Sequence, residues 1–168
     1  MQAMVCELCG STDIVKKDDM FQCQHCGAKY SVEEAKKLIQ VTKECFFEGI
    51  KYAKAGNHLF DISGAIGRYA EERGYGVVRD LCGHGIGTAL HEAPEIPNYE
   101  VGRKGVKLRP GMTLAIEPMI NIGTYEVDWL DDDWTVVTRD GSLSAHYENT
   151  ILITEGEPRI LSLTCDNE

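Results

Sequence analysis

Four cysteines near the N-terminus constrain the fold of this chain more than any other feature of its sequence. They form two C-x-x-C pairs, Cys6 with Cys9 and Cys23 with Cys26, and 13 residues separate the pairs. A glycine follows each pair, and a C-x-x-C-G turn brings two sulfurs together across a tight bend. Four thiolates at this spacing are typical of a tetrahedral zinc site. We therefore predict a structural Zn²⁺ and a zinc ribbon over residues 1–30.

Two alternative interpretations of these cysteines explain less. Free reduced cysteines would leave both spacings to chance, and a thioredoxin-like redox pair would need only one C-x-x-C within a βαβ pattern. The stretch "IVKKDDMFQC" between the pairs predicts a short hairpin that turns near residues 17–19. The charge of the segment is nearly balanced, which disfavours nucleic-acid binding and favours docking to a protein or simple capping of the chain. The ribosome or another protein is the partner we expect if the ribbon docks.

Length and charge restrict the class of protein. The chain has 168 residues and a net charge of −10, which argues against a nucleic-acid binder because such proteins need basic surface. No run of eighteen apolar residues predicts a membrane span, and the N-terminus does not resemble a secretory signal. We therefore expect a cytoplasmic protein that does not bind membranes.

Residues 31–168 predict a second, larger domain of the α+β class. Ser31 and Glu34 form a capping box that opens a helix, for which Gly56 is a plausible stop. A second helix is predicted to run from near Asp61 to Gly74. The pattern then changes to short β runs separated by turn residues, so we expect two helices followed by an antiparallel sheet. The predicted strands cover residues 76–81, 112–120, 134–138, 144–154 and 159–163.

Two glutamates interrupt apolar strands in this domain. Glu117 lies in "MTLAIEPMI" and Glu148 in "SAHYENTILIT", where alternation places His146 and Thr150 on the same face as Glu148. A buried carboxylate is costly unless it is paired or bound to metal, although either glutamate alone could face water on an edge strand. His84 lies in the glycine-rich stretch "LCGHGIGTALHE", which we expect to be a loop. One imidazole and two carboxylates together predict a divalent metal site.

From about residue 41 to residue 163 the chain resembles the C-terminal half of a type I methionine aminopeptidase. The stretches that carry the resemblance are "GYGVVRDLCGHGIGTALHEAPEIPNY", "LRPGMTLAIEPM" and "WTVVTRDGSLSAHYENTILIT". That family has the pita-bread fold, and it removes the initiator methionine from new polypeptides with two divalent metals bridged by a water or hydroxide. The resemblance therefore implies half of a pita-bread fold, a peptide or nascent-chain N-terminus as substrate, and Mn, Co, Fe or Zn as the metal.

The resemblance also implies a role for each motif residue. His84 would be a metal ligand, and Glu117 would be a ligand that also takes the proton of the water. Glu148 would bridge the two metals. His91 of "LHE" would contact the scissile amide and stabilise negative charge on its oxygen.

Leu90 and Trp134 would, by the same resemblance, wall the pocket for the methionine side chain, although Trp134 is equally typical of turn or core packing. In the family the N-terminal half supplies two further metal-binding aspartates and another histidine. No motif in residues 1–40 matches them, so we expect a weak or incomplete hydrolase.

Two further expectations follow from the absence of this half. The alternative function is a non-catalytic binding module, in which the zinc ribbon docks to a partner and carries a degenerate aminopeptidase half-domain. Half of the fold would also leave a sheet edge uncovered, which favours self-association into a homodimer.

Overall fold

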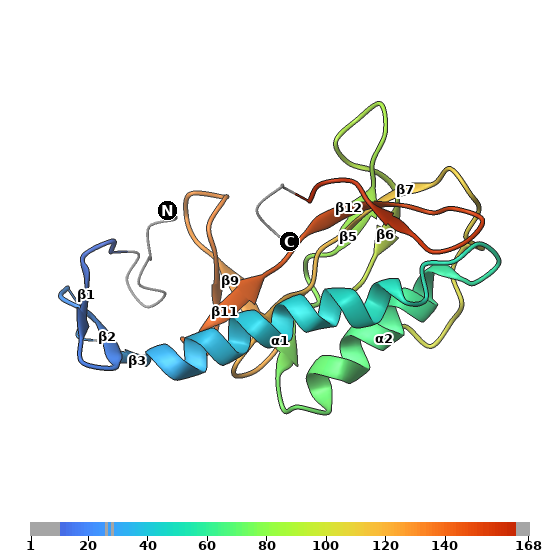
Figure 1. The fold of residues 1–168 in the computed structure, drawn as a ribbon. Helices are drawn as coiled ribbons and strands as arrows, with labels where there is room; N and C mark the ends of the chain where they lie inside the picture. Colours follow the sequence, from blue (N-terminus) through green and yellow to red (C-terminus); the bar gives the residue numbers. More distant parts are fainter. Residues whose placement is uncertain (1–10, 26, 28, 164–168) are drawn as a thin grey trace.

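The computed structural model describes residues 11–25, 27 and 29–163 of the chain. Within them lie two helices and a series of short strands, whose arrangement Figure 1 shows. The helices are α1 (Val32–Ile50) and α2 (Leu59–Glu71). The strands are β1 (Ile14–Lys17), β2 (Met20–Cys23), β3 (Lys29–Ser31), β4 (Gly76–Val77), β5 (Gly83–Gly85), β6 (Glu92–Ile96), β7 (Thr113–Ile116), β8 (Met119–Asn121), β9 (Val127–Trp129), β10 (Val136–Thr138), β11 (Ser144–His146), β12 (Asn149–Leu152) and β13 (Arg159–Ile160).

The strands form small antiparallel sheets. The largest has the order β13-β12-β7-β5-β6, and a three-stranded sheet has the order β11-β8-β4. The pair β9 and β10 forms a hairpin, and β1, β2 and β3 form a separate sheet at the N-terminal end of α1 (Figure 1). The two helices lie together along one side of the strands (Figure 1). The predicted α+β class, with two helices followed by antiparallel strands, is confirmed.

The start of the described chain agrees with two local predictions. Strands β1 and β2 pair as a hairpin that turns after Lys17, and Asp18 in the turn has a positive φ of 56°. The Ser31 hydroxyl accepts the N–H of Glu34 at 3.4 Å, which caps α1 as predicted. Cys23 ends β2 fully buried. The other predicted zinc ligands, Cys6, Cys9 and Cys26, lie outside the described residues, so the zinc site remains a prediction.

Helix α1 is shorter than the sequence predicts. It ends at Ile50, not near Gly56, because the chain turns there and buries Ala53 completely. Gly56 instead lies in the connection between the helices, where its φ is +94° and its N–H donates to the carbonyl of Leu108 at 3.0 Å. The expected stop at Gly56 is therefore wrong: a bond to a distant loop fixes this glycine.

Helix α2 begins two residues earlier than predicted, at Leu59. The carboxylate of Asp61 accepts the backbone N–H of His58 at 2.8 Å, so Asp61 is the third residue of the helix and stabilises its first turn. The helix ends at Glu71, and Gly74 follows with a φ of +81°. This end agrees with the prediction within the usual uncertainty of helix boundaries.

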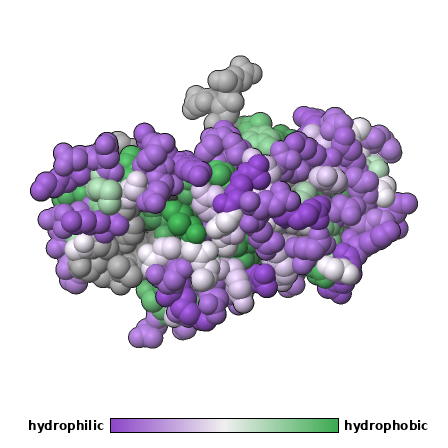
Figure 2. All heavy atoms as spheres, turned by 90° about the horizontal axis from the view of Figure 1, so that it is seen from below, coloured by the Kyte–Doolittle hydropathy of each residue, from purple (hydrophilic) through white to green (hydrophobic). Residues whose placement is uncertain are grey.

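The core lies between the helices and the strands. Buried side chains of α1, which include Leu38 and Phe46, face α2 and the sheets. Gly49 allows the helices to approach closely, because a Cβ there would lie 2.6 Å from Ile66. The ring of Phe46 also packs edge-on against the ring of Tyr147, with the ring centroids 5.4 Å apart, and this contact joins α1 to the segment between β11 and β12. The face seen in Figure 2 is mostly hydrophilic, as expected for amphipathic helices that bury one side.

Two long segments that were predicted as continuous strands are each broken into two. The first divides into β7 and β8 at Glu117 and Pro118, and the second into β11 and β12 at Tyr147 and Glu148. Strands β7 and β12 pair in the five-stranded sheet, whereas β8 and β11 pair in the three-stranded sheet. The N–H of Tyr147 donates to the carbonyl of Pro118 at 3.2 Å, so the two breaks face each other. We call residues 117–118 and 147–148 the junction.

No helix in the described part of the chain is long and apolar enough to cross a membrane.

Candidate metal centre

His84 lies in strand β5, so the expectation of a glycine-rich loop is wrong. It pairs with Ala115 of β7 on one side, and β6 flanks it on the other. The neighbouring glycines are needed for this close packing, because a Cβ on Gly83 or Gly85 would come within 3.0 Å of the backbone of Ala115 or Ala93, respectively. The glycines thus bring strands together around the imidazole, and β5 is rigidly held between two partners.

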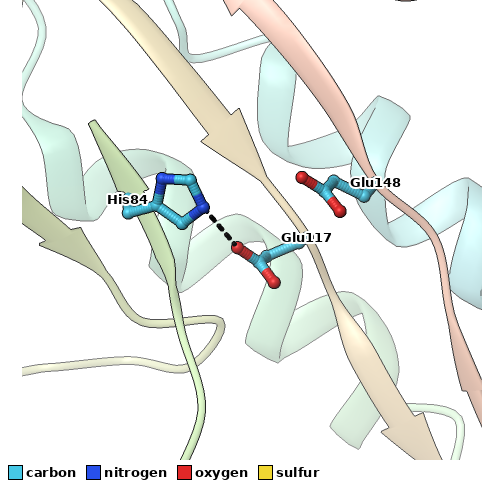
Figure 3. A group of neighbouring side chains, drawn as sticks. All are labelled: His84, Glu117 and Glu148. Atoms are coloured by element: carbon cyan, nitrogen blue, oxygen red, sulfur yellow. Dashed lines mark ion pairs between the residues drawn. The ribbon is translucent and has the colours of Figure 1, made fainter. Parts of the chain in front are cut away.

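The side chains of His84, Glu117 and Glu148 converge at the junction (Figure 3). Each offers a ligand atom that lies within 4.8 Å of the other two. The Nε2 atom of His84 is 3.5 Å from Oε1 of Glu117, and these two side chains are only 13% and 14% exposed. The side chain of Glu148 is 45% exposed. The structure therefore brings together all three residues that the sequence predicts as metal ligands.

The chemistry of this donor set fits a divalent cation. The Nδ1 atom of His84 lies 2.9 Å from the carbonyl of Gly85, which can only accept a hydrogen bond, so Nδ1–H donates and Nε2 is the ring nitrogen that faces Glu117. The imidazole and the carboxylate form an ion pair at 3.5 Å when the ring is protonated, and they can share a cation when it is neutral. Ligands about 2.1 Å from one ion are roughly 3.0–3.5 Å apart at ordinary angles. The observed separation of 3.5 Å is therefore compatible with a shared metal.

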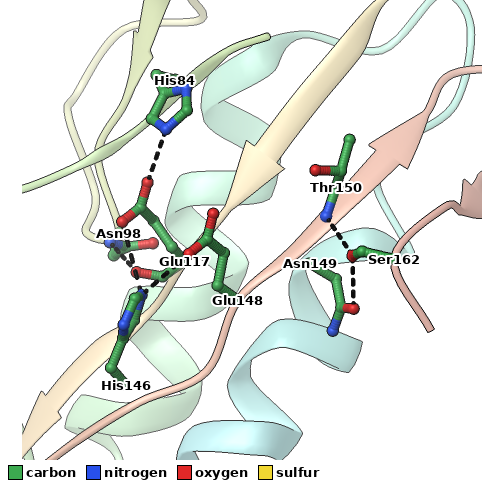
Figure 4. Close-up of polar contacts among 8 residues, drawn as sticks. All are labelled: His84, Asn98, Glu117, His146, Glu148, Asn149, Thr150 and Ser162. Carbon is green, nitrogen blue, oxygen red and sulfur yellow. Dashed lines mark hydrogen bonds and ion pairs between the residues drawn. The ribbon is translucent and has the colours of Figure 1, made fainter. Parts of the chain in front are cut away.

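A buried asparagine holds the backbone of Glu117. Asn98 is completely buried, and its Nδ2 donates to the carbonyl oxygen of Glu117 at 3.1 Å (Figure 4). Helix α2 packs directly against this segment, since a Cβ on Gly67 would lie 3.3 Å from the carbonyl oxygen of Asn98. The helix thus supports the segment that fixes Glu117.

His91 lies beside His84, as the predicted catalytic role requires, but on the exposed connection between β5 and β6. The two imidazole rings pack edge to face with centroids 4.3 Å apart. Both line a pocket of about 560 Å³ together with Cys82, Ala93 and other residues of β5 and β6. Burial raises the pKa of Cys82, so its sulfur stays a neutral thiol at neutral pH.

The connection that carries His91 is ordered by its own polar contacts. The carboxylate of Glu92 accepts the N–H of Ala89 and the hydroxyl of Thr88, both at 2.8 Å. The bond from Ala89 is the main cause that lowers the pKa of Glu92, so this acid is ionised at neutral pH. Its carboxylate is therefore engaged within the connection.

The two residues predicted to wall the methionine pocket are exposed. Leu90 is 66% exposed beside His91, and Trp134 is 85% exposed in the turn between β9 and β10. The N–H of Trp134 donates to Asp132 at 3.0 Å, which fixes this turn. Among the described residues, neither lines the pocket beside His84. Their role in substrate binding remains a prediction.

His146 is a site residue to which the sequence analysis gave no role. Its Nε2 atom lies 3.6 Å from Oε2 of Glu117 and 4.0 Å from Oε2 of Glu148 (Figure 4). The sequence did contain a signal for this residue, because strand alternation placed His146 on the same face as Glu148. Glu117 therefore lies between two imidazoles, those of His84 and His146.

Comparisons with known proteins agree with this architecture. The sequence model of metallopeptidase family M24 matches residues 19–155. A methionine aminopeptidase of Clostridium acetobutylicum is 60% identical over 131 residues, which are 78% of this chain and 52% of that protein. Methionine aminopeptidase 1 of Bacillus subtilis is 51% identical over 123 residues, which are 73% of this chain and 50% of that protein. The chain thus spans about half the length of these relatives.

Solved structures show the same fold. A crystal structure of methionine aminopeptidase from Thermotoga maritima superposes with a TM-score of 0.74 at 45% identity, over 85% of this chain and 58% of that one. The prolidase of Pyrococcus horikoshii, at 23% identity, covers 86% of this chain and 35% of that one with a TM-score of 0.59, which indicates a shared fold alone. The predicted fold class, half of a pita-bread fold, is confirmed by these neighbours.

Proposed function

The chain belongs to metallopeptidase family M24, and from this membership we propose that it is a metal-dependent hydrolase that releases N-terminal methionine from peptides and new polypeptides in the cytoplasm. Its identity of 60% with a protein named methionine aminopeptidase supports this substrate. We expect Mn, Co, Fe or Zn as the metal, because imidazole and carboxylate ligands suit these ions.

The convergence of His84, Glu117 and Glu148 carries the proposal. One donor from strand β5 and one from each break of the junction lie within 4.8 Å of one another, and Nε2 of His84 faces the site while Nδ1 contacts the carbonyl of Gly85. A cluster of carboxylates alone would be common on a surface. The anchored imidazole, which is 13% exposed, makes this cluster specific.

Each site residue has a chemical task that its position supports. When bound, a divalent metal supplies Lewis acidity, which makes water a nucleophile at neutral pH. His84, Glu117 and Glu148 would hold the metal, and Glu117 would accept the proton of the attacking water. His91, beside His84 on the pocket wall, would donate an N–H to the scissile carbonyl oxygen and stabilise negative charge there.

Release of methionine from a short peptide tests this function. The chain loaded with Mn²⁺ is incubated with a Met-Ala-Ser peptide, and free methionine is measured by chromatography. Glu117→Gln should lower the rate at least about 100-fold, because it removes a ligand and the proton acceptor together. Glu155→Gln, a change at an exposed acid beyond the far end of β12, is the matched control and should keep the wild-type rate. Wild-type release no greater than that of Glu117→Gln would contradict the proposal.

A structural zinc ion in the N-terminal segment is a separate proposal. It is supported by the two C-x-x-C pairs and by the burial of Cys23, which ends the second strand of the hairpin predicted for a ribbon. Elemental analysis should find a zinc ion that is retained in His84→Ala and lost in Cys23→Ser. Full retention of zinc in Cys23→Ser would contradict it. A protein or ribosomal partner for this segment remains a prediction.

Self-association of the chain is also a proposal. It is supported by the five-stranded sheet, in which β6 and β13 are the edge strands. Analytical ultracentrifugation at high micromolar concentration should detect a dimer, and a monomer at that concentration would contradict it.

A further inference from the structure

The pocket beside His84 carries an acid that the metal site does not use. Glu95 lies in β6 and pairs with His84 of β5, so the two side chains lie on the same face of the sheet. Glu95 lines the same pocket of about 560 Å³ as His84 and His91. It is not one of the three donors that converge as candidate metal ligands. The fold thus places a further carboxylate one strand away from the site.

The carboxylate of Glu95 has no partner in the part of the chain that the structure describes. Its side chain is exposed, and it makes no hydrogen bond or ion pair with any described residue. Glu92, the other acid of this pocket, differs, because its carboxylate accepts the hydroxyl of Thr88 and the N–H of Ala89. Glu95 is therefore the acid of this pocket that is available to a ligand.

The wall of this pocket is negatively charged. Among the described residues that line it, two are glutamates and none is a lysine or an arginine. The charge of Glu95 also acts on Cys82 in the same wall, where it is, after burial, the next largest cause of the raised pKa of the thiol. A cleft lined by one sign of charge attracts ligands of the opposite sign. The pocket therefore favours a cationic group.

The position of Glu95 relates it to the part of a peptide that follows the scissile bond. Strand β5 lies between β7 and β6, so Glu95 is on the side of His84 that faces away from Glu117. Neighbouring strands lie about 4.8 Å apart, and an extended peptide advances about 3.3 Å per residue. A peptide whose first carbonyl lies beside His91 and which extends along the pocket therefore brings its third residue to Glu95.

We propose that Glu95 is a specificity-determining residue, which binds a basic side chain on the third residue of the substrate peptide. The inference rests on the proposed function, because it concerns the peptide that this function cleaves. The carboxylate would form an ion pair with the ammonium of a lysine or the guanidinium of an arginine, and it would repel an acid at the same place. Because the pocket is open to water, the effect on the rate is a modest factor.

Three peptides that differ only at the third residue test this role. The chain loaded with Mn²⁺ is given Met-Ala-Lys-Ser, Met-Ala-Gln-Ser or Met-Ala-Glu-Ser, and kcat/KM for the release of methionine is measured. The wild type should prefer lysine over glutamate by at least about fivefold, with glutamine between them. Glu95→Gln should lower this ratio below about twofold, and Glu95→Lys should reverse it. Each ratio is taken within one variant, so a change in overall activity or metal content cancels.

Two controls separate a local charge effect from other causes. Glu155→Gln removes the same charge beyond the far end of β12, so it should keep the wild-type ratio. At 1 M salt the screening length is about 3 Å, so the preference of the wild type should shrink while the order of the peptides stays the same.

Peptide binding gives a second readout, which needs no turnover. In the full chain with its zinc retained and without Mn²⁺, Met-Ala-Lys-Ser should shift the amide NMR signals of β6 at a lower concentration than Met-Ala-Glu-Ser does. Glu95→Gln should remove this difference.

The possible failures are distinguishable. If the wild type cleaves all three peptides without preference, or if Glu95→Gln keeps the wild-type ratio, the role of Glu95 is overturned while the peptidase function stands. If no peptide is cleaved but Glu95→Gln removes a difference in binding, the proposed function is overturned and the role of Glu95 in peptide binding stands. If neither cleavage nor a difference in binding is observed, both are overturned.

Discussion

The close contact between α2 and the segment that fixes Glu117 makes Gly67 a sensitive position. A Cβ added there would lie 2.8 Å from Cα of Tyr99 and 3.2 Å from the backbone nitrogen of Glu100. Ordinary van der Waals contact begins near 3.4 Å, so the helix or the segment must retreat by about 0.6 Å. Both partners are backbone, which cannot rotate away as a side chain can.

The expected cost of Gly67→Ala is the difference between two opposing effects. Alanine stabilises a helix interior by about 1 kcal/mol relative to glycine. Overpacking a buried contact costs about 1–3 kcal/mol, and the upper part of that range applies where backbone must move. We expect a net loss of about 1–2 kcal/mol in the free energy of unfolding. The same shift should displace Asn98 and thereby weaken Mn²⁺ binding.

Gly64→Ala is the matched control on the same helix. A Cβ at Gly64 would meet the ends of the side chains of Arg68 and Glu100, which are flexible and partly exposed. This variant should therefore keep most of the helical gain and be as stable as the wild type or more stable. The two variants should differ by about 2–3 kcal/mol, or roughly 5–10 °C in Tm for a chain of this size.

Urea unfolding at equilibrium, followed by circular dichroism, measures this difference, and Mn²⁺ titration measures its effect on the site. A Gly67→Ala variant at least as stable as Gly64→Ala would refute the reasoning. So would a destabilised Gly67→Ala variant that binds Mn²⁺ like the wild type, because the link from the helix to the site would then be absent.

Three more perturbations test the support of the site and of the loops. Asn98→Leu leaves the Glu117 carbonyl without its hydrogen-bond donor, so the free energy of unfolding should fall by about 1–3 kcal/mol and Mn²⁺ should bind roughly tenfold more weakly. An unchanged Mn²⁺ affinity would contradict this. Gly83→Ala forces β5 away from β7, so the free energy of unfolding measured in urea should fall by about 2–3 kcal/mol. Gly156→Ala is the control, because a Cβ there meets open space, and its free energy of unfolding should stay within about 0.5 kcal/mol of the wild type. A backbone N–H bond at 2.7 Å holds the pKa of Asp140 below its ordinary value, so its stabilisation is present at neutral pH and is lost as pH falls through that lowered pKa. Asp140→Asn should therefore be less stable than the wild type at pH 7, by about 1 kcal/mol at most for this exposed carboxylate, and the gap should close as pH falls below about 4, the ordinary pKa of Asp; a constant gap would contradict this.

Local signals in the sequence predicted the parts of the fold that depend on neighbouring residues. The cap at Ser31 and the turn near Asp18 involve contacts over a few positions, which a motif can specify. The meeting of His84, Glu117 and Glu148 was also predicted, because carboxylates within apolar strands need a partner.

The parts that escaped prediction depend on contacts between distant segments. Strand β5 is Gly-His-Gly and β6 contains Pro94, so neither has the composition of a strand, and only pairing with β7 and with each other makes them strands. Helix α1 ends at Ile50 although the residues after it suit a helix, because burial of Ala53 turns the chain.

The breaks at Glu117 and Glu148 were also missed, although Pro118 marks the first of them. Proline has no N–H to donate to a strand ladder, which permits the chain to pass from one sheet to the next. His146 was overlooked for a different reason: alternation placed it on the same strand face as Glu148, but a histidine in that position is also ordinary on an exposed strand. Its position opposite Glu117 is visible only once β8 and β11 are paired.

Glu117 and Glu148 occupy positions where the backbone belongs neither to the five-stranded sheet nor to the three-stranded sheet. A substitution at such a position can alter which atoms point at the ion without shifting the alignment of any strand, so evolution can exchange oxygen for nitrogen there at little risk to folding. Chains that share this fold can consequently differ in the metal they prefer while their architecture stays unchanged.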